Sequence, residues 1–253
     1  MKKNLIFLFP ILFLPLFYFL FISDNSKTTK NNKINSIDEI NMENDLEIIN
    51  FTNNLDYYNF PKDNEVVKRI IGFLTPFEVS YLIDLAEKNF DNFKKSTIIN
   101  KNNGNLEIDK SRTSKSFFID KSNNEIIKNI ENKASKLSNI PAENIEGIQI
   151  VRYFPGDLYE PHFDSFEDNY VGHNGNGQRV VTFFVYLNNN FKGGTTFFPN
   201  LGKHFKGNPG DAFFWINTIN GNRDFRTLHS GTKILNGKKY GLNIWIRDKK
   251  FIP

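Results

Sequence analysis

Four runs of β-branched and aromatic residues after Pro141 constrain the fold of this chain more than any other feature of its sequence. They cover residues 146–154, 179–187, 211–217 and 238–247, and turns rich in Gly, Asn and Pro separate them. Parallel strands need long connections that are usually helical, and no helical period lies between the later runs. The pattern therefore predicts antiparallel strands in a sandwich or jelly roll and disfavours a parallel α/β sheet.

Two segments with helical periodicity precede these strands. Residues 75–78, Thr-Pro-Phe-Glu, have the form of a capping box with proline at the first helical position, and apolar residues follow at helical spacing. The second segment is expected to begin in the same way, with Ser122 as N-cap and Glu125 three residues later. The predicted fold class is α+β: a double-stranded β-helix core (jelly roll, cupin-like) with flanking helices, folded from near Val66.

The N-terminus carries a different signal. Residues 5–22 are apolar and uncharged, which suits a short transmembrane helix and is long for the core of a cleavable signal peptide. We expect residues 1–22 to be an uncleaved signal anchor with one transmembrane helix, residues 23–60 a polar, disordered stalk, and residues 61–253 the folded domain. A cleaved signal peptide is the alternative. The lysines on the two sides of the apolar stretch hardly decide its orientation; we expect the bulk of the chain to be translocated, into the endoplasmic reticulum lumen or otherwise outside the cytoplasm.

Composition excludes several classes of site. The chain has no cysteine, so it has no disulfide framework, thiolate metal site or cysteine nucleophile, and any metal must be held by nitrogen and oxygen. Its net charge of +4 is mild, and its lysines are scattered along the sequence rather than gathered in a stripe. We therefore expect no nucleic-acid partner.

One histidine stands two positions from an aspartate, in a chain with only four histidines. On a strand, His162 and Asp164 would point to the same side. His229 lies 67 residues after His162, beside another predicted strand. Two histidines and one carboxylate are the facial triad of non-haem Fe(II) oxygenases, which leaves positions open for a cosubstrate and dioxygen. The alternative is a structural histidine hydrogen-bonded to a nearby aspartate.

Lys239 follows ten residues after His229, in the next predicted strand. If the cosubstrate is 2-oxoglutarate, the carboxylate far from the metal needs a cation, and Lys239 could supply it. The alternative is that Lys239 is a solvated lysine at a strand end, beside Lys238.

The chain from Val66 to Arg247 resembles the catalytic domain of prolyl 4-hydroxylases, which are Fe(II)- and 2-oxoglutarate-dependent dioxygenases. The matching segments occur in the family's order with the family's spacing: FLTPFEVSYLIDLAE, SRTSKSFF, PAENIEGIQIVRYFPGDLYEPHFD, GQRVVTFFVYLNN, GGTTFFP, GDAFFW, the lone His229 and GKKYGLNIW.

The resemblance implies a role for eleven residues. It makes His162, Asp164 and His229 the iron ligands and Lys239 the anchor of the far carboxylate. It also implies three groups of binding residues: Tyr153 and Thr196 as further 2-oxoglutarate partners, Arg112 and Ser114 in a mobile loop that closes over a peptide, and Tyr159, Arg179 and Trp245 in a proline groove. The alternatives are that the aromatic residues belong to the core, that Thr196 is an ordinary strand residue and that Arg179 is a solvated strand end.

The function implied by the resemblance is that of a prolyl 4-hydroxylase, which uses O2 and 2-oxoglutarate, with ascorbate, to hydroxylate peptidyl proline and releases succinate and CO2. The apolar residues 5–22 add the expectation that this enzyme is anchored in a membrane. We expect a proline-rich protein or peptide partner and a monomer without a disulfide-isomerase subunit. Arg247 departs from the family, whose animal and algal members tend to have His near this position. His173 and His204 are expected in loops. Two alternatives stay open: a 2-oxoglutarate dioxygenase for a lysyl residue, a free amino acid or a small metabolite, and a jelly-roll binding module without turnover.

Overall fold

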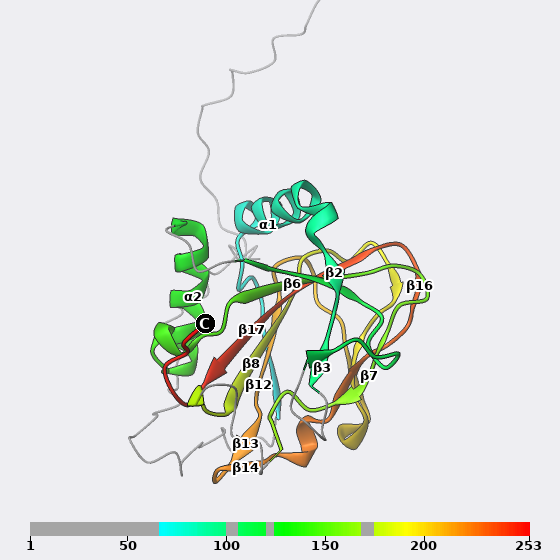
Figure 1. Cartoon of the computed structure of the whole chain (residues 1–253). Coiled ribbons are helices and arrows are strands. Elements are labelled where there is room, and N and C mark those ends of the chain that lie inside the picture. The colour runs from blue at the N-terminus through cyan, green and yellow to red at the C-terminus, as the bar shows by residue number, and fades with distance from the viewer. Residues whose placement is uncertain (1–65, 100–105, 120–123, 168–174) are drawn as a thin grey trace, which may run out of the picture. The chain divides into compact units, whose positions relative to one another are not determined.

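The computed structural model describes residues 66–99, 106–119, 124–167 and 175–253 (Figure 1). The expected transmembrane segment and stalk, residues 1–22 and 23–60, lie outside the described residues. Within the described ranges, no helix is both long enough and apolar enough to span a membrane.

A seven-stranded sheet forms the centre of the fold, and all its neighbouring strands are antiparallel, as the sequence predicted. Four of its strands are the four predicted apolar runs. In spatial order the strands are β1 (Val67–Ile70), β12 (Ala212–Ile216), β8 (Arg179–Tyr186), β17 (Lys239–Arg247), β6 (Ile148–Tyr153), β5 (Lys115–Ile119) and β2 (Lys94–Lys95).

A smaller sheet faces this one and completes the jelly roll. Its order is β11 (Lys203–Phe205), β10 (Thr196–Phe198), β15 (His229–Gly231) and β7 (Tyr159–His162). The sheets pack through aromatic side chains; for example, the rings of Phe198 and Trp215 lie edge to face with centroids 5.3 Å apart. Three two-stranded ladders complete the strands: β3 (Ile98–Ile99) with β4 (Leu106–Glu107), β9 (Lys192–Gly193) with β16 (Ile234–Asn236), and β13 (Thr218–Ile219) with β14 (Asn222–Arg223).

Two α-helices precede the main strands. Helix α1 (Pro76–Lys88) has the predicted capping box between Thr75 and Glu78. Helix α2 (Glu125–Ser138) begins differently from the prediction, because Asn124 rather than Ser122 is its N-cap. The Asn124 side chain accepts the first free backbone N–H groups of the helix, so a better capping residue lies nearer to Glu125 than Ser122 does. Short 3₁₀ turns occur at Phe90–Asn92, Ala142–Asn144, Pro199–Leu201 and Phe225–Thr227.

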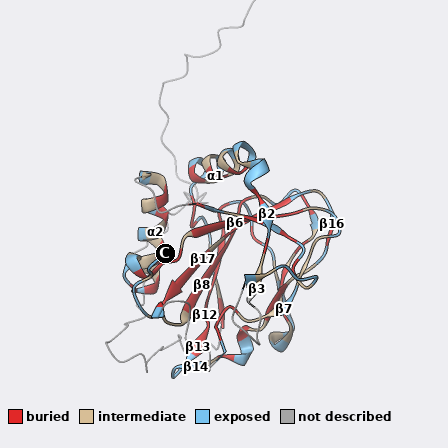
Figure 2. Cartoon of the chain, in the orientation of Figure 1, coloured by how far each residue is buried: buried red, intermediate tan, exposed pale blue. Residues whose placement is uncertain are grey.

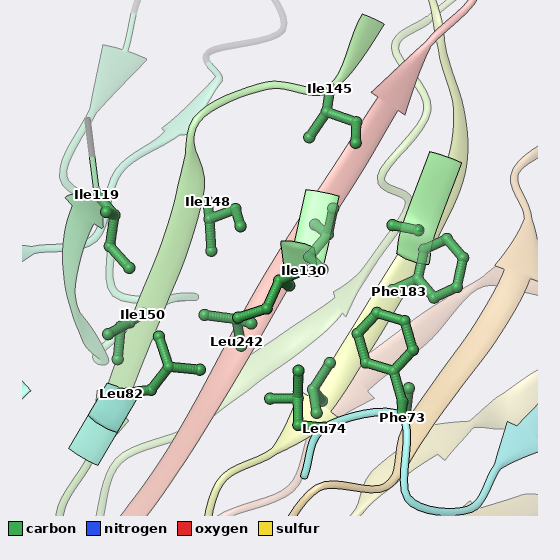
Figure 3. Close-up of a cluster of buried hydrophobic side chains, with 14 of the residues drawn as sticks. Phe73, Leu74, Leu82, Ile119, Ile130, Ile145, Ile148, Ile150, Phe183 and Leu242 are labelled. Atoms are coloured by element: carbon green, nitrogen blue, oxygen red, sulfur yellow. The ribbon is translucent and has the colours of Figure 1, made fainter. Parts of the chain in front are cut away.

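Both helices pack on one face of the large sheet. Leu82 of α1 and Ile130 of α2 are fully buried against strand residues such as Ile150 and Leu242 (Figure 3). The central strands are buried along most of their length (Figure 2). The opposite face of the same sheet is turned toward the small sheet, and the candidate site lies there.

Candidate metal centre

A pocket between the two sheets collects most of the residues singled out in the sequence. Nine of the eleven predicted site residues line it: Arg112, Tyr153, Tyr159, His162, Asp164, Thr196, His229, Lys239 and Trp245. Ser114 and Arg179 are not among its lining residues. Segments far apart in the sequence therefore meet at one site.

His162, Asp164 and His229 form the metal-binding group that the spacing predicted. His162 ends β7 and His229 begins β15, and the two residues are direct partners across this antiparallel pair. Their ligand atoms and those of Asp164 all lie within 4.8 Å of one another. Asp164 is not on a strand, contrary to the expectation; it lies in a bend just past β7, and its side chain turns back toward both histidines.

Both imidazole rings are held in the orientation that a metal needs. The Nδ1 of His162 lies 2.8 Å from the carbonyl oxygen of Glu160, and the Nδ1 of His229 lies 2.9 Å from that of Thr227. A carbonyl oxygen can only accept, so each Nδ1 carries the proton and donates it. The Nε2 lone pair of each ring is left free for a metal, as in other histidine sites with a fixed outer partner.

The third ligand is fixed by a hydrogen-bonded chain that sequence reasoning missed. Thr182 donates from Oγ1 to Oδ2 of Asp164 over 2.8 Å, and Thr182 accepts in turn from Nδ2 of Asn217 over 2.9 Å. Thr182 is fully buried in the middle of β8. The signal in the sequence was a hydroxyl residue inside the apolar run 179–187, at a position where burial costs free energy unless a partner is present.

The protonation states also suit a cation. Burial and the neighbouring His229 hold the pKa of His162 well below its usual value, so its ring is neutral at neutral pH. Burial by itself raises the pKa of Asp164, but the combined effect of His229, His162, Arg179 and the hydrogen bond from Thr182 outweighs it, so the pKa is lowered. A carboxylate and two imidazoles are the donor set that Fe(II) takes in non-haem oxygenases, so the residues present fit the ion.

Lys239 lines the same pocket and is only 2% exposed, so it is not the solvated strand-end lysine of the alternative. Its Nζ donates to the carbonyl oxygen of Gly194 over 2.7 Å and lies 4.7 Å from the ring centroids of Phe184 and Tyr186. No carboxylate among the described residues forms an ion pair with it. Burial, and to a smaller extent the nearby Lys206, lowers the pKa of Lys239 to about 7. A buried amine without an anion fits a ligand that brings its own carboxylate.

Thr196 lines the same pocket as this lysine. Its Oγ1 is 2.9 Å from the hydroxyl of Tyr186, a buried residue that sequence reasoning missed. Tyr153 also lines the pocket, with its ring centroid 5.4 Å from the Lys239 Nζ. Together these side chains surround the amine with hydroxyl groups and aromatic rings.

The peptide-groove candidates divide into two sets. Arg112 lies over the ring of Tyr159 at 4.6 Å, and Tyr159 stacks on His162 with ring centroids 3.5 Å apart. Ser114 is fully buried and donates to the hydroxyl of Ser96. The resemblance implied that Arg112 and Ser114 belong to a mobile loop; the structure places both in a buried hydrogen-bonded network.

Arg179 does not line the pocket, but it contacts Trp245, which does. It forms a two-pronged ion pair with Glu146 over 2.6 and 2.7 Å, and its guanidinium lies 3.9 Å from the ring centroid of Trp245. Arg247, the departure from the family pattern, also donates to Glu146. The pair of arginines explains why burial does not neutralise this carboxylate: its pKa is lowered despite the desolvation that opposes ionisation.

The remaining histidines take no part in the metal group. His204 lies on β11 rather than in the expected loop, stacks on Phe197 and hydrogen-bonds with Thr195. His173 lies outside the described residues.

A jelly roll that holds two histidines and one aspartate in its interior defines the class of non-haem Fe(II) oxygenases. The model of the 2OG-Fe(II) oxygenase superfamily matches residues 148–247. The chain is 31% identical over 199 residues to "Probable prolyl 4-hydroxylase 10" of Arabidopsis thaliana, an alignment that covers 71% of the chain and 68% of the relative. It is 35% identical over 193 residues to "Prolyl 4-hydroxylase 1" of the same plant, with 70% and 67% covered.

A solved structure agrees with these sequence matches. The viral collagen prolyl hydroxylase of Paramecium Bursaria Chlorella virus-1, in its 2-oxoglutarate complex, superposes with a TM-score of 0.57 and 26% identity over 73% of this chain and 97% of the viral one. The chain belongs to the 2OG-Fe(II) oxygenase superfamily and is related to the plant and viral prolyl 4-hydroxylases. It is a dioxygenase of prolyl 4-hydroxylase type whose cofactor is Fe(II) and whose cosubstrate is 2-oxoglutarate.

Proposed function

We propose that the protein hydroxylates proline residues in proline-rich peptides or proteins. The observation that carries the proposal is one pocket lined by a His-Asp-His group, by a buried amine that has no carboxylate partner among the described residues, and by the aromatic rings of Tyr159 and Trp245. The names of the plant and viral relatives support peptidyl proline as the substrate.

With Fe(II) and 2-oxoglutarate bound, the centre would supply the oxidative decarboxylation of 2-oxoglutarate by O2, which is coupled to hydroxylation of the substrate. The chain's own residues supply orientation. His162, Asp164 and His229 would hold the metal and leave its remaining positions to the cosubstrate and O2. Lys239 would bind the carboxylate farthest from the metal and so fix the direction in which 2-oxoglutarate lies. The buried rings of Phe184 and Tyr186 exclude water from this end of the site.

Tyr159 is suited to position a proline ring. Its ring stacks on His162 and lies 4.6 Å from the guanidinium carbon of Arg112, and these contacts restrict its rotation. Proline-rich chains are already extended as polyproline II, and a fixed aromatic surface therefore binds them at a low cost in conformational entropy. Positioning of this kind holds the target carbon next to the metal.

The further parts of the proposal rest on the sequence. We propose that ascorbate keeps the iron reduced, that the enzyme acts as a monomer, and that the apolar residues 5–22 anchor it in a membrane with the catalytic domain in the endoplasmic reticulum lumen or otherwise outside the cytoplasm. Carbonate extraction of membranes tests the membrane anchor, and protease protection of the domain tests its orientation. Release by carbonate would contradict the anchor, and digestion in sealed vesicles would contradict the orientation.

The catalytic proposal is tested by succinate formation. The Fe(II)-loaded full-length chain is given O2 and 2-oxoglutarate with a proline-rich peptide, or with the same peptide in which alanine replaces every proline. We expect the proline peptide alone to stimulate succinate release and to gain one oxygen atom per succinate. Stimulation by a lysyl peptide, a free amino acid or a small metabolite instead would assign another substrate. Tight binding of Fe(II) and 2-oxoglutarate without any succinate would indicate a binding module.

A further inference from the structure

The bend that carries Asp164 is not held by a strand ladder. β7 ends at His162, and among the described residues none of residues 163–166 takes part in a backbone–backbone hydrogen bond. Thr182 holds one carboxylate oxygen of Asp164, but a single hydrogen bond to a side chain does not fix the backbone that carries it. The position of the bend therefore depends on contacts from other side chains.

Arg223 grips the residue that follows the aspartate. Its Nε donates to Oγ of Ser165 over 3.1 Å, and its Nη2 donates to the carbonyl oxygen of Ser165 over 2.9 Å. Ser165 is only 4% exposed. Two donors on one edge of a planar guanidinium fix the direction of their partner as well as its distance. The side chain and the carbonyl group of Ser165 are thus held by one group.

The same guanidinium also contacts the residue before the aspartate. Its carbon lies 4.6 Å from the ring centroid of Phe163, which is within the range of a favourable contact between a cation and an aromatic ring. Farther along the bend, Gln178 holds Phe166 through two hydrogen bonds. Arg223 therefore contacts both sequence neighbours of Asp164, and the bend is fixed again just beyond them.

Arg223 is itself anchored next to the threonine that holds the aspartate. It ends β14, whose ladder with β13 follows directly on the end of β12 (Figure 1). The backbone N–H of Asp224 donates to the carbonyl oxygen of Asn217 over 2.9 Å, and the side chain of Asn217 donates to Thr182. The arginine and the threonine that act on the bend therefore share one anchor, the segment just after β12.

The contacts of Arg223 differ from those of its neighbour Arg226. Arg226 lies three residues later and forms an ion pair with Asp224 over 2.8 Å. Arg223 is half-buried and forms no ion pair with a carboxylate among the described residues. A guanidinium has donors and no acceptor, so the two oxygen atoms of Ser165 satisfy it without a counter-charge. The two arginines thus provide a matched pair, of which one contacts the bend.

We infer that Arg223 is a positioning residue of the metal centre, which holds the bend so that the carboxylate of Asp164 stays within reach of the ion shared with His162 and His229. The inference concerns the metal group alone and holds for any substrate. Partners that orient a metal ligand typically change metal affinity by about tenfold to a hundredfold. Without Arg223 the carboxylate would keep its bond to Thr182 but would leave its place more often, so the metal should dissociate faster.

The test measures Fe(II) binding to the full-length chain in the absence of O2, by competition with a coloured chelator that also reports the rate of release. Arg223→Met keeps most of the side-chain stem and removes the guanidinium. We expect the Kd for Fe(II) to rise about tenfold, mainly through faster release, while the Tm of the metal-free protein stays within a few degrees of the wild type. Arg223→Lys should lose as much affinity, because an ammonium group lacks the two-pronged edge.

Ser165→Ala tests the same contact from the other side. It removes Oγ and leaves the carbonyl oxygen, so the Kd for Fe(II) should rise less than in Arg223→Met. The double variant should bind Fe(II) no more weakly than Arg223→Met alone, because both substitutions remove one shared contact. Multiplication of the two effects in the double variant would overturn the inference, since the arginine and the serine would then act separately.

Arg226→Met is the matched control, because the Arg226 side chain is 45% exposed and pairs with Asp224 instead of the bend. It should keep the wild-type Kd. A wild-type Kd in Arg223→Met, full affinity in Arg223→Lys, or an equal rise in Arg226→Met would overturn the positioning role. A large fall in the Tm of metal-free Arg223→Met would overturn it too, because the arginine would then stabilise the fold rather than the metal centre.

Discussion

The two faces of the seven-stranded sheet use the same strands for opposite purposes. On the face toward the helices, β6, β8 and β17 present apolar residues such as Ile150, Phe183 and Leu242, which form one closed cluster with α1 and α2. On the other face, alternate residues of the same strands include Tyr153, Thr182 and Lys239, which surround the pocket or hold its ligands. A one-residue shift in register would exchange the two sets.

The difference shows where stability and function reside. Burial of apolar area on the helix face stabilises the fold with no need for specific partners. On the pocket face, buried polar groups cost free energy unless they are paired. Among the described residues, Lys239 has a carbonyl partner but no carboxylate, and the indole N–H of Trp245 has no hydrogen-bond partner. Apolar burial on the helix face therefore has to offset the free-energy cost of the buried polar groups on the pocket face that await a ligand.

The strongest test of this division is His229→Ala on the pocket face. Loss of one of three ligands should reduce succinate formation by more than about a thousandfold and abolish retention of Fe(II) after desalting. The metal-free variant should unfold within a few degrees of the metal-free wild type, because a ligand is lost and no apolar contact of the helix face changes. His204→Ala, on β11, is the control and should keep both activity and iron. Retention of a tenth of the activity by His229→Ala would contradict the assignment of the ligand.

Lys239→Met should separate ligand binding from stability. Loss of the cation leaves the far carboxylate of 2-oxoglutarate unpaired, so the Kd for 2-oxoglutarate should rise by about a hundredfold to a thousandfold. The ligand-free variant should nevertheless be more stable than the wild type. The unfolded lysine binds its proton up to its ordinary pKa and the folded one only up to about 7. Stability of the wild type therefore rises with pH between these values.

The measurement for this variant is Tm against pH without ligand. The gap in favour of Lys239→Met should be full below pH 7 and should close as the pH approaches 10. Lys238→Met is the matched control, since Lys238 is half exposed and its partner is Glu87 on the surface. It should leave the Kd and the pH profile unchanged. A Lys239→Met variant that is less stable at pH 6 would show that the lysine has a structural role instead.

Ile130→Ala probes the helix face alone. Ile130 is fully buried in α2, so the cavity left behind should lower the free energy of unfolding by about 2–5 kcal/mol. Urea unfolding measures the loss, and the KM values for 2-oxoglutarate and peptide should stay within about twofold of the wild type. Lys128→Ala, an exposed position of the same helix, should change stability by less than about 0.5 kcal/mol. A changed KM in Ile130→Ala would show that the two faces are coupled.

Thr182→Val should have the smallest effect of the four. The substitution keeps the volume but leaves Asp164 and Asn217 without their shared hydroxyl, so affinity for the metal should fall about tenfold. Competition with a chelator measures this affinity. Thr182→Ser restores the hydroxyl and should recover most of it. Equal affinity in the valine and serine variants would show that the hydroxyl does not position the aspartate.

The strands and the His162–Asp164 pair could be predicted because each depends on a local pattern that neighbouring residues show. His229 and Lys239 were candidates from their places beside later predicted strands, and the resemblance then gave each of them a role. The second face of each strand was harder to predict. Thr182 and Asn217 lie 35 residues apart, and only the β8–β12 neighbourhood brings them to one carboxylate. Asp164 lies past the end of its strand because the chain bends there, which the period-two pattern could not indicate.

The partner of Arg179 could not be predicted for a similar reason. Arg179 could be read as a solvated strand end, but its partner Glu146 is 33 residues away in the sequence and meets it only after β8, β17 and β6 have paired. Asn124 replaced Ser122 as the N-cap because two capping residues compete within one short segment, and sequence alone does not rank them. Hydrogen-bond and ion-pair partners that come from distant segments could be identified only in the structure.

The arrangement of the three ligands makes the metal a cross-link between two sheets. His162 and His229 belong to the small sheet, whereas Asp164 is held by Thr182, which belongs to the large one. An ion bound to all three would join β7 and β15 to β8 through a short chain of bonds. Metal loading should then protect the protein from proteolysis in proportion to occupancy, so that the supply of iron in its compartment would set how long the protein survives as well as how fast it works.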